Sequence, residues 1–141
     1  IQRQGFKYHM NNVNATIGLC QLDDVESVIE RHVSNGRFFD RALQGVPGIE
    51  LLSYYEGSEP SYWLYTLFVE NREGLVRKLQ EHGVMSSVLH KRNDAHQFLN
   101  DYDQELPTLD AVYNRLLHLP CGWWVDNEDR ERIADLIRSG W

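Results

Sequence analysis

One segment limits what this chain can fold into more than any other: residues 62–69, which read Tyr-Trp-Leu-Tyr-Thr-Leu-Phe-Val. All eight residues are aromatic, β-branched or leucine, so both faces of the segment are apolar. Strands with two apolar faces lie inside a sheet and are covered on both sides. The segment therefore predicts a central strand with helices packed on the sheet.

The segments before this strand predict a helix and a second strand. Apolar residues recur at nearly helical spacing over residues 12–44, which predicts one long amphipathic helix that stops by residues 45–48. Gly18 and Gly36 weaken that helix locally and indicate close packing or a kink. Residues 49–55 are apolar enough for a strand, and residues 56–60 are typical of a turn.

The segments after the central strand alternate in type. Residues 71–82 predict a short helix that buries Leu75, Val76 and Leu79 and stops at Gly83, and residues 84–89 predict another strand, reached by a right-handed crossover. Residues 91–106 are polar and predict a loop with room for one helical turn. The last two segments are helices: one opens at Pro107, with its apolar face ending at Leu116, and one runs from Asp126 to Gly140.

Together these segments predict an α/β (α+β) fold. We expect a small, mostly antiparallel or mixed sheet of three to four strands, with helices packed on it and one long helix before it. With 141 residues the chain is long enough to bury a core without disulfides or metal. We expect one domain over residues 1–141, in which residues 1–48 form an interface segment and the long helix, and residues 49–141 form the sheet and its helices.

Charge and cysteine usage exclude several classes of protein. The formal net charge is -7, and no run of Lys or Arg is longer than Lys91-Arg92, which argues against nucleic acid or an anionic membrane surface as partner. No apolar stretch approaches the ~20 residues of a membrane span. Cys20 and Cys121 form no CxxC pair, which argues against structural zinc and favours a reducing cytoplasm. The start at Ile1 rather than at a methionine favours a chain cut from something longer.

Two polar clusters are candidate binding sites. In residues 5–12, Lys7 precedes a helix start capped by Asn11 or Asn12, where backbone N–H groups can hold a phosphate; ordinary capping beside a solvated lysine is the alternative. In residues 89–94, His90 and Arg92 can bind a carboxylate or phosphate; a solvated loop neutralised by Asp94 is the alternative.

Two further groups carry weaker signals. Trp123 and Trp124 either line a pocket or subunit contact or, as is more common for such a pair, close a core. Cys121 has no partner that would activate it, so we expect a buried, inert thiol. The six histidines show no metal-ligand spacing, and no pair of carboxylates stands out as an acid and a base. We therefore expect no metal site and nominate no catalytic residue.

Residues 5–22 resemble a signature of the DegT-type sugar aminotransferases, fold-type-I enzymes that use pyridoxal 5'-phosphate on nucleotide-linked keto sugars. The family pattern is approximately Gly-x-Asn-x-Arg-Met, a few polar residues, then Ala-x-Ile-Gly-x-x-Gln-Leu, and this chain reads Gly-Phe-Lys-Tyr-His-Met and Ala-Thr-Ile-Gly-Leu-Cys-Gln-Leu. The order of the later segments is also similar, so the resemblance covers nearly the whole chain. It implies the small C-terminal domain of such an enzyme.

The resemblance also implies roles for individual residues. The Schiff-base lysine of the family belongs to a larger N-terminal domain, so this chain alone is expected to be unable to transaminate. Lys7 stands where the family has the asparagine that reaches across a dimer interface to the cofactor phosphate of the neighbouring subunit; with Asn11 it is the expected cofactor contact. His9, His90, Arg92 and Asn93 are expected to meet the sugar or its diphosphate.

The hypothesis that follows is the C-terminal part of a homodimeric enzyme that interconverts a keto sugar and an amino sugar, with glutamate as amino donor. Its partners are then the N-terminal large domain, a second copy and a nucleotide-sugar. Two alternatives stay open: a free-standing noncatalytic module for protein association or small-ligand binding, and a parent of the same family that dehydrates the sugar.

Overall fold

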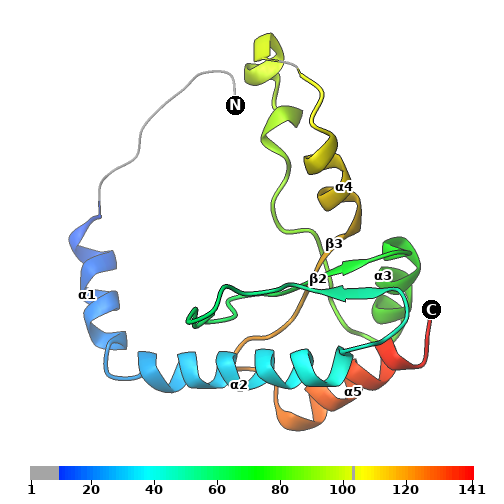
Figure 1. Ribbon diagram of the computed structural model, residues 1–141. Helices are drawn as coiled ribbons and strands as arrows, with labels where there is room; N and C mark the ends of the chain where they lie inside the picture. The colour runs from blue at the N-terminus through cyan, green and yellow to red at the C-terminus, as the bar shows by residue number, and fades with distance from the viewer. Residues whose placement is uncertain (1–9, 103) are drawn as a thin grey trace.

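The computed structural model describes residues 10–102 and 104–141, which form a three-stranded antiparallel sheet with helices (Figure 1). This confirms the predicted fold class. None of the helices in these two ranges is long and apolar enough to cross a membrane. The elements, in chain order, are α1 (Asn12–Gln21), α2 (Val25–Leu43), β1 (Ile49–Leu51), β2 (Tyr65–Val69), α3 (Arg72–Glu81), the 3-10 helices η1 (Asn93–Ala95) and η2 (Gln97–Tyr102), α4 (Pro107–Arg115), β3 (Leu116–Leu119) and α5 (Asn127–Arg138).

The central position of the predicted strand is confirmed, because β2 lies between β1 and β3. The strand is shorter than predicted: it begins at Tyr65, because Tyr62 has a positive φ of 48° that no strand can continue through. Tyr65, Leu67 and Val69 alternate with Thr66 and Phe68, and the first three are buried while the other two are half-buried. The core joins the buried face of β2 to side chains of α2, α3 and α5. These helices therefore cover one face of the sheet, and Thr66 and Phe68 belong to the other.

The prediction of one long helix over residues 12–44 is wrong, because α1 ends at Gln21 and α2 begins at Val25. The break does not fall at Gly18; it falls beside Asp23 and Asp24, residues that favour caps over helix interiors. α2 buries one side in the core, whereas α1 buries no residue and leaves the body of the domain at an angle (Figure 1).

The prediction of a strand over residues 84–89 is also wrong. This segment makes one isolated antiparallel bridge, between Ser87 and His118. The third strand is β3, whose first residue, Leu116, was expected to lie on a helix face. A short apolar run fits a strand or a helix end equally well, so periodicity alone does not separate the two. Because β3 pairs antiparallel with β2, it separates β2 from Ser87.

The remaining helices follow the sequence signals. Asn71 and Asp126 cap α3 and α5 by accepting hydrogen bonds from the backbone N–H groups of Gly74 (3.1 Å) and Asp129 (2.8 Å). Gly83 stops α3 in the left-handed region, with φ of 74°. The polar segment after residue 90 holds two short 3-10 helices where one turn was expected.

Candidate functional site

The residues expected to bind cofactor and substrate lie in two separate places. Lys7 and His9 fall outside the described residues. Asn11 caps α1, and its Oδ1 accepts a hydrogen bond from the backbone N–H of Asn14 at 2.8 Å. His90 belongs to the segment that leads from α3 towards η1, and Figure 1 shows this segment apart from α1. One chain therefore does not bring Asn11 and His90 into one site.

The ring of His90 lies beside the indole of Trp63, with ring centroids 6.1 Å apart and an angle of 45° between the planes. Trp63 is 65% exposed, so one aromatic surface and one titratable imidazole meet at the solvent boundary. Such a pair offers a ligand an apolar ring surface next to a hydrogen-bonding group. Trp63 was expected only as part of a strand, and its role beside His90 was not predicted.

The position of Trp63 is set by its neighbour, Tyr62. Tyr62 has φ of 48°, in the left-handed region that bulky residues rarely adopt. Its ring covers Gly36 of α2, where an added Cβ would lie 2.2 Å from ring carbons. Its hydroxyl donates a 2.5 Å hydrogen bond to Oδ2 of Asp40. Burial, with the Asp40 carboxylate second, raises the pKa of Tyr62, so the hydroxyl keeps its proton and remains a donor.

His118 of β3 adds a second imidazole near His90. It is 8% exposed, and its Nδ1 lies 3.0 Å from the Thr66 hydroxyl, its neighbour across the strands. Its Nε2 is buried and has no hydrogen-bond partner within the described part of the chain. Burial, with the charge of His90 second, lowers the pKa of His118, which favours a neutral imidazole. No sequence signal indicated this contact, because β3 was not predicted.

Arg92 is engaged with carboxylates of its own chain. Its Nε donates to Oδ1 of Asp94 at 2.9 Å, its Nη2 donates to Oδ2 of the same residue at 2.5 Å, and its Nη1 donates to Oδ1 of Asp110 in α4. The guanidinium also lies 5.8 Å from the centre of the Tyr113 ring. Hydrogen bonding to Arg92 lowers the pKa of Asp94. Asn93 begins η1 and is exposed, as is His90.

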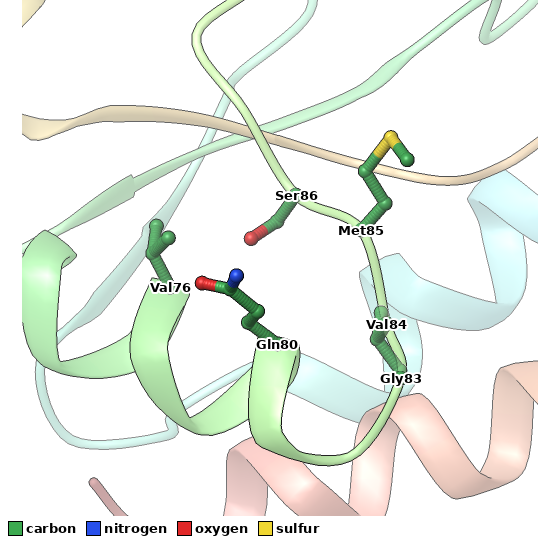
Figure 2. A pocket seen from close by; sticks show the side chains of 6 residues that line it. All are labelled: Val76, Gln80, Gly83, Val84, Met85 and Ser86. Atoms are coloured by element: carbon green, nitrogen blue, oxygen red, sulfur yellow. The ribbon is translucent and has the colours of Figure 1, made fainter.

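A cavity of about 390 Å³ lies between α3 and the segment that follows it (Figure 2). Ser86 and Gln80 point their polar groups towards each other across this space, and Met85 points away. The Ser86 hydroxyl is buried and has no hydrogen-bond partner within residues 10–102 and 104–141. The other lining residues are Val76, Gly83 and Val84, so none of the lining side chains is a base that could activate the hydroxyl, and the cavity has room for a small group.

The described residues do not form a complete pyridoxal phosphate site. Such a site needs a lysine amine for the Schiff base. Lys78 donates to the Ser139 hydroxyl at 2.7 Å and to the Gly140 carbonyl, at the end of α5, and Lys91 is exposed beside His90. The third lysine, Lys7, lies outside the described residues. No group of three His, Cys, Asp or Glu side chains that could hold a metal occurs in the ranges that the structure covers.

The tryptophan pair does not close the core, contrary to expectation. Trp123 and Trp124 are 60% and 61% exposed, and the Trp124 ring covers Gly122, where an added Cβ would meet it at 2.3 Å. The expected burial of Cys121 is confirmed, and burial raises its pKa to about 12, which favours an unreactive thiol.

Apolar residues are also exposed on both projecting helices: Val13, Ile17 and Leu19 on α1, and Leu109 and Val112 on α4. Exposed apolar surface of this extent is typical of faces that associate with other protein.

Comparison with solved structures finds the same fold in sugar aminotransferases. The structure superposes on sugar aminotransferase CalS13 from Micromonospora echinospora with a TM-score of 0.91 and 36% identity, covering 97% of this chain and 37% of that one. It superposes on AtS13 from Actinomadura melliaura with a TM-score of 0.91 and 40% identity, covering 99% of this chain and 37% of that one.

Sequence comparison gives the same grouping. A curated relative, the UDP-4-amino-4,6-dideoxy-N-acetyl-beta-L-altrosamine transaminase of Campylobacter jejuni, is 21% identical over 142 residues, which are 96% of this chain and 38% of the relative. The chain thus spans less than two fifths of the length of the proteins it matches. The model of the DegT/DnrJ/EryC1/StrS aminotransferase family matches residues 2–138. Because that match covers nearly the whole sequence, this chain belongs to the DegT/DnrJ/EryC1/StrS aminotransferase family.

Proposed function

We propose that this chain is the C-terminal part of a pyridoxal-phosphate-dependent aminotransferase that acts on a nucleotide-linked keto sugar with glutamate as amino donor. The observation that carries the proposal is the family match over residues 2–138 in a chain that covers only 37% of each similar solved structure. The exposed apolar faces of α1 and α4 support a missing large domain and a second copy as their partners. The two free cysteines, Cys20 and Cys121, favour a cytoplasmic enzyme.

The cofactor, held by the missing domain, would supply the electron sink that lets an amino group move between two carbon skeletons. This chain's contribution would be binding and orientation. Lys7 would meet the cofactor phosphate as a point charge, and Asn11 would hold the helix start beside it. His9 would extend the same surface towards the substrate.

The separation of Asn11 from His90 supports a site shared between two copies. In a shared site, residues 7–11 of one subunit would complete the cofactor phosphate contact of the other, while His90 and its surroundings would serve the sugar in their own subunit. Neither group then needs to reach the other within one chain, which agrees with the separation of α1 from the segment after α3 (Figure 1). We therefore propose a homodimer.

The substrate surface would be formed by His90, Asn93 and the exposed indole of Trp63, with Arg92 beside them. Sugar rings have apolar C–H faces that stack on aromatic rings, and their hydroxyls need hydrogen-bond partners. The Trp63 and His90 pair supplies both, with ring centroids 6.1 Å apart.

The activity is tested with the complete polypeptide, including the cofactor-binding domain, and with the 141-residue chain in parallel. We expect the complete protein to convert a nucleotide-linked keto sugar to the amino sugar while glutamate becomes 2-oxoglutarate, and the chain alone to form no Schiff base with pyridoxal phosphate. Loss of water from the sugar without 2-oxoglutarate would identify a dehydratase and contradict the proposal. Absence of both reactions would favour the noncatalytic module.

The shared site is tested by co-expressing two variants of the complete protein, Lys7→Ala and His90→Ala, each of which should be nearly inactive alone. In a mixed dimer one site receives both intact residues and the other neither. Since half of randomly paired dimers are mixed, we expect about a quarter of wild-type activity to return. His82→Ala, an exposed histidine at the end of α3, is the matched control and should be fully active. No recovery in the mixture would show that each site lies within one chain.

A further inference from the structure

We propose that Arg92 is a positioning residue, which ties the segment carrying His90 to α4 through Asp110, in place of the direct substrate contact that the family resemblance implies. This inference rests on the proposed function, because the surface that Arg92 would position, around His90, is the one proposed to bind the nucleotide-sugar.

The hydrogen bonds that Arg92 makes within the chain leave few of its guanidinium N–H groups free to bind a ligand. Its Nε and both terminal nitrogens donate to Asp94 and Asp110, and its side chain is only 19% exposed. A diphosphate at this guanidinium would have to displace two carboxylates or approach beside them, and like charges in close contact repel. Bidentate recognition of a phosphate uses two parallel N–H groups, and in Arg92 the Nε and Nη2 groups already donate to Asp94.

The same bonds connect two parts of the chain that lie far apart in sequence. Asp94 is two residues from Arg92, whereas Asp110 is 18 residues away in α4. α4 is in turn fixed to the sheet at its last residue, Arg115, which pairs with Glu50 of β1 at 2.8 Å and lies 5.6 Å from the centre of the Phe68 ring of β2. Arg92 therefore links the start of the polar segment to α4, and α4 is itself bonded to the sheet through Arg115.

His90 has two neighbours that bear on its position. Trp63 contacts its ring on one side, and Arg92 holds the backbone two residues later. In the described part of the segment between Arg92 and α4, the regular elements are the short helices η1 and η2, and Figure 1 shows these helices standing away from α2 and α5, which cover the sheet. Without the bond to Asp110, the start of this segment would lose its one described ion pair to α4. A displacement of about 1 Å at a binding group is enough to weaken a site strongly.

Removing the Asp110 carboxylate is expected to change nucleotide affinity in opposite directions for the two possible roles of Arg92. If Arg92 binds phosphate directly, Asp110→Ala frees its guanidinium and should tighten nucleotide binding. If Arg92 positions His90, the same change loosens the segment and should weaken binding about fivefold, equivalent to the upper range for an exposed ion pair. Asp110→Glu keeps the carboxylate and should restore wild-type affinity. Glu105→Ala is the matched control, because it makes the same charge change just before α4, outside the Arg92 ion pairs.

The measurement is calorimetric titration of the complete protein with UDP and with dTDP, together with hydrogen–deuterium exchange of residues 90–95. We expect Asp110→Ala to weaken nucleotide binding and speed exchange, and to have no further effect in an Arg92→Met background. Unchanged or tighter binding by Asp110→Ala would overturn the positioning role while leaving the proposed function intact. A wild-type protein that binds neither nucleotide would overturn the proposed function and this role with it.

Discussion

The contact between Gly36 and Tyr62 offers a direct test of how the site is built. Gly36 is buried in α2, and an alanine Cβ there would lie 2.2 Å from the carbons of the Tyr62 ring. Heavy atoms do not approach this closely, so the ring of a Gly36→Ala variant must move. Tyr62 is 7% exposed and bonded to Asp40, so it has little free space to move into. We therefore expect Gly36→Ala to destabilise the chain.

The magnitude follows from three contributions. Alanine is favoured over glycine inside a helix by about 1 kcal/mol, which acts in favour of the variant. Overpacking a well-packed site costs about 1–3 kcal/mol. Moving Tyr62 also weakens its hydrogen bond to the Asp40 carboxylate, and bonds to charged groups contribute about 1.5–3 kcal/mol. The net expectation is a loss of about 1.5–5 kcal/mol in the free energy of unfolding.

Urea unfolding followed by circular dichroism measures this loss, and two comparisons identify its cause. Gly18→Ala makes the same change in α1, where an added Cβ meets nothing within 4 Å, and should cost no stability. In a Tyr62→Ala background the clash is absent, so Gly36→Ala should there be neutral or stabilising. If Gly36→Ala is as stable as Gly18→Ala, or costs the same with and without the Tyr62 ring, the proposed packing is wrong.

Three further predictions concern buried polar groups. Asn35→Leu should lower the free energy of unfolding in urea by about 2 kcal/mol, because the buried amide of Asn35 donates to the Gly122 and Val125 carbonyls of the loop between β3 and α5 and accepts from Arg130, and all three hydrogen bonds would be lost. Titration with a thiol reagent at pH 8 should modify the exposed Cys20 at once and Cys121 only after denaturation, because burial raises the pKa of Cys121 to about 12. His118 has a pKa that folding lowers from 6.5, so the unfolded state takes up the proton first and stability should fall as the pH drops below 6.5 towards the folded-state value. In His118→Phe this part of the pH dependence, measured by urea unfolding at each pH, should disappear; an unchanged slope would contradict the assignment.

The parts of the fold that the sequence predicted are those whose signals are local. β2 could be placed because it lies in an eight-residue run of aromatic, β-branched and leucine residues, a composition that favours a central strand, although only the last five of these residues form it. α3 and α5 could be placed because Asn71 and Asp126 supply caps, while Gly83 and Gly140 supply positive-φ stops, with φ of 74° and 77°. Each of these signals depends on residues within one turn or one strand, so no tertiary contact is needed to read it.

The parts that were missed depend on contacts between distant residues. β3 is a four-residue apolar run directly after a helix, and only its pairing with β2 makes it a strand. The turn before Trp63 depends on the packing of the Tyr62 ring against Gly36 of α2. The sequence of α2 does not indicate which ring will pack there. The place of His118 was missed for the same reason, because it lies beside Thr66 only through the pairing of β3 with β2.

Arg92 shows why a correctly predicted group can still have an unexpected role. The cluster of His90, Arg92 and Asn93 was recognised as a set of donors, and the structure does place them together after α3. Local sequence also offered Asp94 as a partner, but one carboxylate leaves a terminal nitrogen of the guanidinium free for a phosphate. That nitrogen instead donates to Asp110, which lies 18 residues later in α4. Removal of Asp110 is therefore expected to weaken nucleotide binding, whereas it would tighten binding if Arg92 contacted the phosphate directly. The chemistry available to a ligand is therefore set by the hydrogen bonds that the fold has already used, and a test of sign at Asp110 distinguishes the two roles where loss of Arg92 itself would not.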